Sequence, residues 1–412
     1  MSLTNDALTD TEAHAVDAAK TDLKSAMPAL VALAVSIFVA MTTELLPVGL
    51  LPQMGAAFGK SITEVGVLVT IYAGMVAVFS IPLTIWTKRV PRKQLLLTML
   101  ITFAISSILV AASPNFTVMA IGRAIGGASH ALFFAVALGY PARILRPWDL
   151  GKGMAITGAG VSLGHVVGVP LATALGVATN WRWAFGAVAI MAVLLCMVVA
   201  KVLPSVPNPI AQVKTVRPPG AVTAFSAVMT VNLLLYLGHY TAYTYINPLL
   251  RDAGASESFV AIALLVFGAV GIIGLLAAGS QMDTRPRKAL LVTMVAFVAG
   301  LVLLYFSGSS LVATVGSAAI WCVAFGSAPA FFTTAAIRTN AVTPDMSAAW
   351  INATANVGIA MGAVTGAKII DASNLQGVSL GAAGIFAVCT IVVFFAKRGF
   401  PHADPKIIQT IK

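Results

Sequence analysis

A single acidic side chain, Glu44, stands inside the first long apolar stretch of the sequence, which begins near Met27. A carboxylate near the centre of a bilayer costs roughly 2.5–3.5 kcal/mol, so it is retained where it faces protein or water and has a function. Glu44 is therefore predicted to bind a proton that is exchanged across the membrane. A purely structural ion pair is the alternative.

Arg123 and His130 are the other candidates for proton coupling. Arg123 lies in the fourth apolar stretch. It and Glu44 are a similar number of residues from the outer ends of their spans, and a helix rises about 1.5 Å per residue, so the two side chains are expected at roughly the same depth in the membrane. Opposite charges at equal depth predict that the two are partners, directly or through water; a bracing role for Arg123 is the alternative. His130, on the same helical face as Arg123, is predicted to extend a proton path or contact substrate, or else to be a packing residue. His165 is predicted to be structural.

A polar and aromatic stripe marks the seventh apolar stretch. Its members recur at intervals of three or four residues, which places them on one helix face: Asn232, Tyr236, His239 or Tyr240, Tyr243 and Asn247. Because hydroxyl groups facing lipid stay unsatisfied, the stripe is predicted to face a substrate cavity, or otherwise another helix. Asn352 and Asn356 repeat the spacing from the opposite wall. Apolar surface is expected from Phe133, Phe134, Trp321 and Phe325, for which packing is the alternative role.

The composition is that of an integral membrane protein. Of the 412 residues, 59% are hydrophobic and 9% are charged, whereas an ordinary soluble domain has about 25% charged residues. The net charge of +11 is interpreted as basic loops on one side of a membrane rather than as a nucleic-acid surface. The three cysteines have no ligand spacing, so neither a disulfide framework nor a metal is predicted, and no cofactor is expected.

Twelve stretches reach the roughly 20 apolar residues that a transmembrane helix needs. They cover about 28–51, 62–86, 94–112, 116–141, 150–178, 183–203, 221–249, 258–281, 288–307, 311–337, 346–369 and 377–396. Lys and Arg gather in alternate loops, which predicts that both termini are cytoplasmic. The predicted location is a bacterial-type cytoplasmic membrane.

The chain is predicted to consist of two six-helix repeats. PRKQLLLTM at 91–99 recurs as PRKALLVTM at 286–294, and a glycine ladder in the fifth span (Gly160, Gly164, Gly168) recurs in the eleventh (Gly358, Gly362, Gly366). Glycines at this spacing let helices approach closely. The predicted segments are a cytoplasmic tail at 1–26, a first bundle at 27–203, a proline-rich linker at 204–220, a second bundle at 221–397 and a tail at 398–412.

These motifs resemble those of the major facilitator superfamily over essentially the whole chain. TELLPVGLLP at 43–52 resembles the first-helix signature of its proton-coupled drug and sugar efflux branch, and GRAIGGASHA at 122–131 resembles its fourth-helix motif with Gly126 in place of glutamine. The segment 158–176 is similar to the antiporter motif, and 238–250 to the seventh helix of sugar-efflux permeases. The resemblance implies an all-α fold of two six-helix bundles related by pseudo-two-fold symmetry.

The cytoplasmic gate is expected to be unusual. The superfamily's glycine and aspartate between helices two and three are absent from 84–93, whereas the repeat copy at 279–288 keeps both. Lys88 or Arg89 is predicted to meet Asp345, while Asp283 is predicted to meet Arg143, Arg146 or the start of the fifth span. The alternative is that these charges only set the topology.

The combined features predict a secondary active transporter. It is expected to export a small neutral or amphiphilic molecule, sugar or drug-like, in exchange for protons by alternating access. Proton-symport uptake or facilitated diffusion of a sugar or nucleoside is the alternative within transport. A membrane sensor or enzyme is the alternative outside it, and no nucleophile–base spacing supports an enzyme. The expected partners are the substrate, protons and lipid, without nucleic acid, and the chain is expected to be monomeric.

Overall fold

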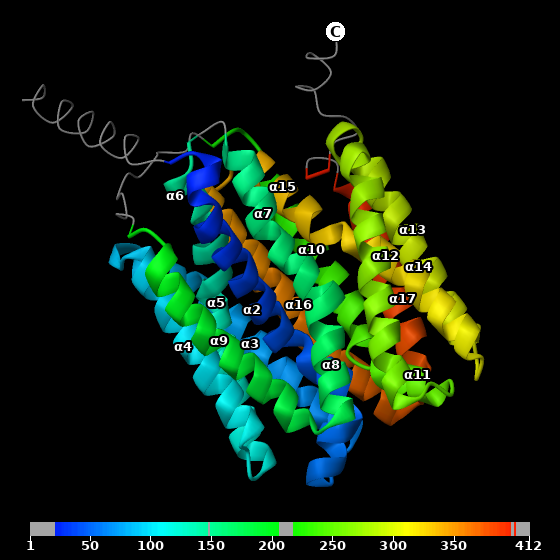
Figure 1. Ribbon diagram of the computed structural model, residues 1–412. Coiled ribbons are helices and arrows are strands. Elements are labelled where there is room, and N and C mark those ends of the chain that lie inside the picture. Colours follow the sequence, from blue (N-terminus) through cyan, green and yellow to red (C-terminus); the bar gives the residue numbers. More distant parts are fainter. Residues whose placement is uncertain (1–20, 147–148, 206–216, 397–398, 401–412) are drawn as a thin grey trace, which may run out of the picture.

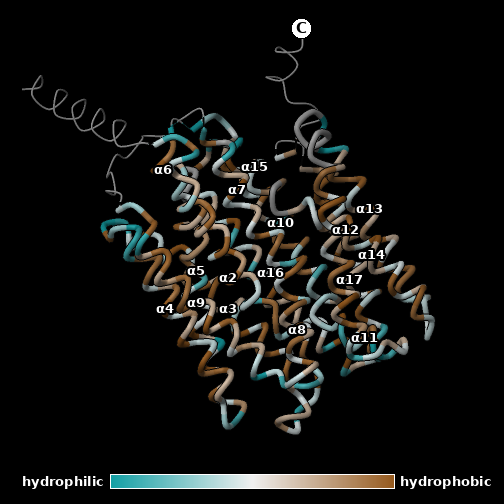
Figure 2. The backbone as a smooth tube through the Cα atoms, in the orientation of Figure 1, coloured by the Kyte–Doolittle hydropathy of each residue, from teal (hydrophilic) through white to brown (hydrophobic). Residues whose placement is uncertain are grey.

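The computed structural model describes residues 21–146, 149–205, 217–396 and 399–400. Within them, twelve helical spans are long and apolar enough to cross a membrane, which confirms the predicted number. An isolated bridge between Thr21 and Leu145 is the one extended pairing among these residues. The fold class is therefore all-α. In Figure 2 the apolar colouring follows the helices, and hydrophilic residues gather at their ends.

The first six spans comprise nine helical segments and a short 3₁₀ turn. They are α2 (Leu23–Phe58), α3 (Ile62–Trp86), η1 (Thr87–Arg89), α4 (Arg92–Ala111), α5 (Phe116–Gly139), α6 (Pro141–Ile144), α7 (Leu150–Leu163), η3 (Gly164–Gly168), α8 (Val169–Ala178) and α9 (Trp181–Val202). The fifth span is continuous through α7, η3 and α8, and η3 is a π-helical turn.

The last six spans comprise eight helices. They are α10 (Ala221–Tyr243), α11 (Ile246–Asp252), α12 (Glu257–Thr284), α13 (Pro286–Phe306), α14 (Leu311–Gly326), α15 (Ala328–Arg338), α16 (Pro344–Ala372) and α17 (Gly377–Phe395). The seventh span is interrupted between α10 and α11, and the tenth between α14 and α15. Most of the predicted linker, 206–216, lies outside the described residues.

Local chemistry explains where several helices begin and end. Ser61 and Glu64 form a reciprocal capping box at the start of α3, and Asn115 accepts a backbone hydrogen bond from Val118 at the start of α5. Such caps satisfy amide groups that have no helical partner. The long helix α2 ends at Gly59, whose φ of 61° lies in the left-handed region that glycine adopts without strain.

Both ends of the helical core lie on one side of the molecule. In Figure 1, α2 begins and α17 ends at the upper side, which we call the terminal face; the opposite side is the far face. Because each span reverses direction, an even number of spans returns the chain to the side from which it started. The two ends of the helical core therefore lie on the same side, as the sequence predicts for the two termini.

The two glycine ladders have equivalent roles in the two repeats. A Cβ atom added at Gly160 would lie 2.1 Å from the carbonyl oxygen of Ala34 in α2, and one added at Gly358 would lie 2.6 Å from that of Leu233 in α10. The remaining ladder glycines are equally close to the same partner helices. The fifth span thus packs on the first as the eleventh packs on the seventh, which supports the predicted repeat.

Candidate functional site

A cavity lies between the two sets of six helices, and Glu44 is in its wall. We call it the central cavity; its volume is about 170 Å³. Its polar and aromatic lining residues are Glu44, His130, Phe134, His165, Tyr236, Tyr240, Phe325, Thr333, Asn352 and Asn356. The lining continues to Leu138, next to the last residue of α5, and to Ala348, near the start of α16. The cavity therefore extends from mid-helix toward the terminal face.

The far face is closed by contacts between the two repeats. The side-chain amide of Asn247 in α11 donates a hydrogen bond of 2.6 Å to the carbonyl oxygen of Gly49 in α2. Nearby, Gly66 of α3 is so close to the Tyr245 hydroxyl oxygen that an added Cβ atom would lie 2.7 Å from it. Asn247 therefore joins the repeats beyond the cavity rather than lining it, contrary to the predicted substrate contact.

The carboxylate of Glu44 is buried and is only partly engaged. Oε2 lies 3.7 Å from Nε2 of His130, too far for a hydrogen bond but close enough for electrostatic attraction. Oε1 is buried and has no hydrogen-bond partner within the described part of the chain. The side chain is 7% exposed. A buried carboxylate oxygen without a donor is costly unless it is protonated or meets a ligand.

Arg123 does not bind the Glu44 carboxylate, so the predicted direct pairing is wrong for this structure. Its guanidinium donates instead to two backbone carbonyl oxygens of α2, from Nη1 to Thr43 at 2.7 Å and from Nη2 to Glu44 at 2.8 Å. The reason lies in the sequence of α2. Pro47 lacks the N–H that would bond the Thr43 carbonyl four residues earlier, and this oxygen is left for Arg123.

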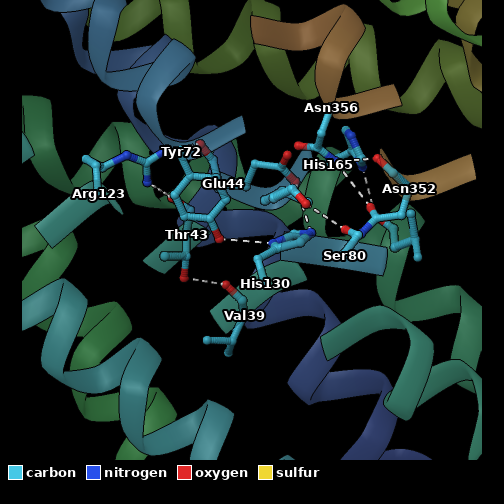
Figure 3. A network of polar contacts seen from close by, with 12 residues as sticks. Val39, Thr43, Glu44, Tyr72, Ser80, Arg123, His130, His165, Asn352 and Asn356 are labelled. Atoms are coloured by element: carbon cyan, nitrogen blue, oxygen red, sulfur yellow. Dashed lines mark hydrogen bonds and ion pairs between the residues drawn. The ribbon is translucent and has the colours of Figure 1, made fainter. Parts of the chain in front are cut away.

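Tyr72, which the sequence reasoning did not single out, joins these groups into one chain of contacts. Its ring lies 4.0 Å from the Arg123 guanidinium carbon, and its hydroxyl oxygen is 3.0 Å from Nδ1 of His130. When Glu44 is ionised, the His130 tautomer with its hydrogen on Nε2 matches both neighbours, because Nε2–H then faces the negative carboxylate and Nδ1 accepts the Tyr72 hydroxyl. In Figure 3, Arg123 and Tyr72 lie on one side of Glu44, and the two asparagines lie on the other.

The asparagines of α16 line the opposite wall, as predicted. Asn352 donates to the Ser80 hydroxyl of α3 at 3.1 Å, a contact between the two repeats. Asn356 donates to the backbone and side-chain oxygens of Asn352, at 3.0 and 3.2 Å. Its own Oδ1 is buried without a partner among the described residues. Two fully enclosed acceptor atoms without a partner among the described residues, Glu44 Oε1 and Asn356 Oδ1, thus belong to residues that line the central cavity.

The aromatic stripe of α10 divides between two environments. Tyr236 and Tyr240 line the central cavity. His239 and Tyr243 line a smaller adjoining pocket. Asn232 instead donates to Ile351 and Thr354 of α16, so it contacts another helix, the alternative that the sequence left open.

Phe133 is not a cavity residue. Its side chain is fully buried and packs edge-on against Phe103 and Phe134, and Phe134 is the one of the pair that lines the cavity. Residues adjacent in a helix point about 100° apart, so at most one of the two faces the cavity squarely. Phe134, and not Phe133 as predicted, therefore supplies apolar surface to the central cavity.

His165 lines both cavities, a position that its predicted structural role does not require; that role stays a prediction. It lies in the π-helical turn η3, which ends two residues before Pro170, a residue without a backbone N–H to donate. Single π turns inside α-helices are frequent at functional sites because they redirect side chains. The turn could not be recognised from the glycine ladder, whose regular spacing implies an unbroken helix.

The predicted gate pairs remain predictions. Lys88 and Arg89 are exposed in η1 near the terminal face. The side chains of Asp283 and Asp345 lie outside the described residues, so their pairing with Lys88, Arg89, Arg143 or Arg146 is not tested.

Comparison with known proteins gives the same architecture. Residues 33–227 match the family profile described as Major Facilitator Superfamily. The structure is similar to that of a bacterial homologue of the human lysosomal transporter Spinster in an inward-facing, occupied conformation, with a TM-score of 0.73, 16% identity, and coverage of 92% of this chain and 98% of that one.

Two transporters with other printed functions have the same fold. A crystal structure of the D-xylose–proton symporter matches with a TM-score of 0.69 and 14% identity over 93% of this chain and 99% of that one. The human organic anion transporter MFSD10 (TETRAN) matches with a TM-score of 0.64 and 16% identity over 90% and 100%. At these identities the likeness shows the fold alone. The chain has the twelve-helix fold of the major facilitator superfamily, and its residues 33–227 carry that family's sequence pattern.

Proposed function

We propose that the chain is a secondary active transporter of the major facilitator superfamily that exports a small neutral or amphiphilic molecule in exchange for protons. One observation carries the proposal: the Glu44 carboxylate lies in the wall of the cavity between the repeats, with Oε1 unpartnered. This oxygen is available both to a proton and to a hydrogen-bond donor on a substrate. Competition between the two for one carboxylate couples their movements in opposite directions.

The surrounding contacts supply a route from the proton to the helices. Ionised Glu44 attracts the Nε2–H edge of His130, and His130 is held by the Tyr72 hydroxyl. Protonation removes that attraction and leaves His130 free to turn toward the cavity. Because Tyr72 also supports the guanidinium of Arg123, which is bonded to the backbone of α2, the change reaches the proline-containing segment of the first helix.

Two amide contacts support alternating access. Asn247 bonds Gly49 beyond the cavity on the far face, and Asn352, in the cavity wall, bonds Ser80 on the terminal-face side of Glu44. Each is a contact between repeats on one side of Glu44. A rocking motion that separates one pair and keeps the other exposes the site to one side of the membrane at a time.

Transport in purified form tests the proposal. Proteoliposomes with an acidic lumen in a neutral bath would be given labelled sugars, nucleosides or amphiphilic antibiotics. Antiport predicts that a substrate accumulates inside as protons leave, and that Glu44→Gln equilibrates the substrate without accumulating it. Accumulation only with the gradient reversed would establish proton symport, and equilibration under either gradient in the wild type would establish facilitated diffusion.

A further inference from the structure

A second pocket adjoins the central cavity and is largely aromatic. It lies between the fifth span and α10, α12 and α14, and its volume is about 90 Å³. We call it the aromatic pocket and define it by His165, His239, Tyr243, Phe267, Cys322 and Phe325. Val161, His165, Tyr240 and Phe325 line both this pocket and the central cavity, so the two spaces meet at these side chains.

The proton on His239 is placed by Trp321. The indole Nε1–H of Trp321 donates to Nδ1 of His239 at 3.0 Å. An indole nitrogen is only a donor, so Nδ1 must be the unprotonated nitrogen of the ring and Nε2 carries the hydrogen. The imidazole is held in place, because its ring is stacked on Phe325 at 3.6 Å and on Tyr243 at 4.8 Å between centroids. His239 therefore presents a fixed hydrogen-bond donor.

In His165 the hydrogen is on the other ring nitrogen, Nδ1. Its Nδ1 lies 3.0 Å from the backbone carbonyl oxygen of Val161. A carbonyl oxygen only accepts, so Nδ1 carries the hydrogen and Nε2 is a bare acceptor. The bond runs back along the helix, from the π-helical turn η3 into α7. His165 therefore presents a hydrogen-bond acceptor.

Both Nε2 atoms are left for a ligand. Neither has a hydrogen-bond partner within the described residues. Neither is fully enclosed by protein, because the enclosed atoms without a partner in that part of the chain do not include them. Both rings line the aromatic pocket, His165 from the first repeat and His239 from the second. The two imidazoles thus bring one donor and one acceptor from different repeats to a largely aromatic pocket, whose lining also includes the hydroxyl side chains of Ser162, Tyr240 and Tyr243.

We propose that the aromatic pocket binds a hydroxyl group of a neutral, ring-containing substrate, which accepts a hydrogen bond from His239 Nε2–H and donates one to His165 Nε2. A hydroxyl satisfies both nitrogens at once. An ammonium group cannot accept from His239, and a carboxylate cannot donate to His165. The aromatic walls favour the ring that carries the hydroxyl. The inference deepens the proposed transport function by naming its substrate class: phenols and related neutral ring alcohols.

Two simple probes separate the two hydrogen bonds. 4-Ethylphenol can accept from His239 and donate to His165, whereas its methyl ether, 4-ethylanisole, can only accept. Binding of each to the purified full-length protein in nanodiscs would be measured by calorimetry. The proposal predicts that the phenol binds wild type about tenfold more tightly than the ether, the usual effect of one buried hydrogen bond.

Substitutions that imitate one ring nitrogen at a time supply matched controls. His165→Asn keeps a group near Nδ1 and loses Nε2; it should weaken the phenol about tenfold and leave the ether unchanged. His239→Asn should weaken both probes about tenfold. Glutamine reaches the Nε2 position, so His165→Gln and His239→Gln should each bind the phenol within about threefold of wild type.

The result that overturns the proposal is equal binding of phenol and ether to wild type, binding of neither, or a His165→Asn variant that weakens both alike. The wild-type comparison needs no variant and stands if one fails to fold. Proton release with Glu44→Gln is a separate measurement. If the protein prefers the phenol but shows no proton release that depends on Glu44, antiport is refuted and the proposal for the aromatic pocket stands. If proton release depends on Glu44 but the phenol is not preferred, the proposal for the pocket is refuted and antiport stands.

Discussion

Arg123 donates a hydrogen bond to the carbonyl oxygen of Thr43, 80 residues earlier in the chain, and so takes the place of a donor that the helix itself lacks. Pro47 is the residue whose missing N–H leaves this oxygen free. The most buried cation of the first repeat therefore stabilises a proline-containing helix instead of neutralising the acid beside it. Glu44 keeps one carboxylate oxygen for exchangeable partners.

Removing the guanidinium should destabilise the protein in a way that depends on Pro47. Arg123→Leu leaves the carbonyl oxygen of Thr43 buried without a donor, at a cost of about 1–3 kcal/mol. Pro47→Ala restores the helical N–H to Thr43, so in that background Arg123→Leu should cost about 1–2 kcal/mol less. Reversible unfolding in mixed micelles measures the cycle, and additive effects would show that Arg123 does not serve the Thr43 carbonyl.

Tyr72→Phe should impair coupling without impairing folding. The variant keeps the ring beside Arg123 and loses the hydroxyl that holds His130. We expect proton-driven accumulation to fall by about tenfold, consistent with one lost hydrogen bond, while the thermal midpoint stays within a few degrees of wild type. Tyr72→Leu, which loses ring and hydroxyl, should lower both. Unchanged accumulation in Tyr72→Phe would exclude His130 positioning from the mechanism.

Gly160 should tolerate no side chain, whereas its neighbour Gly158 should. A Cβ atom at Gly160 would lie 2.1 Å from the backbone oxygen of Ala34, while one at Gly158 would have no atom within 4 Å. Because alanine is a better helix former by about 1 kcal/mol, Gly158→Ala should be neutral or stabilising. Gly160→Ala should lower the unfolding temperature by several degrees. Equal effects of the two substitutions would show that α7 does not pack closely on α2.

The two asparagine contacts between the repeats should bias the conformation in opposite directions. Asn247→Ala removes the bond to Gly49 and should favour opening at the far face; Asn352→Ala removes the bond to Ser80 and should favour opening at the terminal face. Spin labels at Lys60, in the loop between α2 and α3, and at Asp252, the last residue of α11, would report the difference by pulsed electron paramagnetic resonance, since both residues are exposed. Shifts of the same sign in both variants would refute the assignment of opposite gates.

The architecture was predictable from the sequence because it depends on composition and spacing within each segment. Apolar length defined the spans, and the recurring glycines of the fifth and eleventh spans indicated close helix packing, which Gly160 and Gly358 show. Glu44 stood out because a charge at that depth is expensive.

What depended on distant contacts was not predictable. Spacing placed Arg123 and Glu44 at equal depth, but the partner of the guanidinium was decided by Pro47, whose effect appears only when α2 continues through it. His239 is oriented by Trp321, 82 residues away, and no local pattern connects them. The π turn at His165 is a local change that a regular glycine ladder conceals.

Proton release on substrate binding tests the central claim most directly. Wild type and Glu44→Gln would be purified, placed in weak buffer and titrated with candidate sugars, nucleosides and neutral phenols while the pH is recorded. The account predicts that a substrate which binds both proteins releases protons from wild type and none from Glu44→Gln. Release that persists in Glu44→Gln, or binding to wild type without any release, would contradict the role assigned to Glu44.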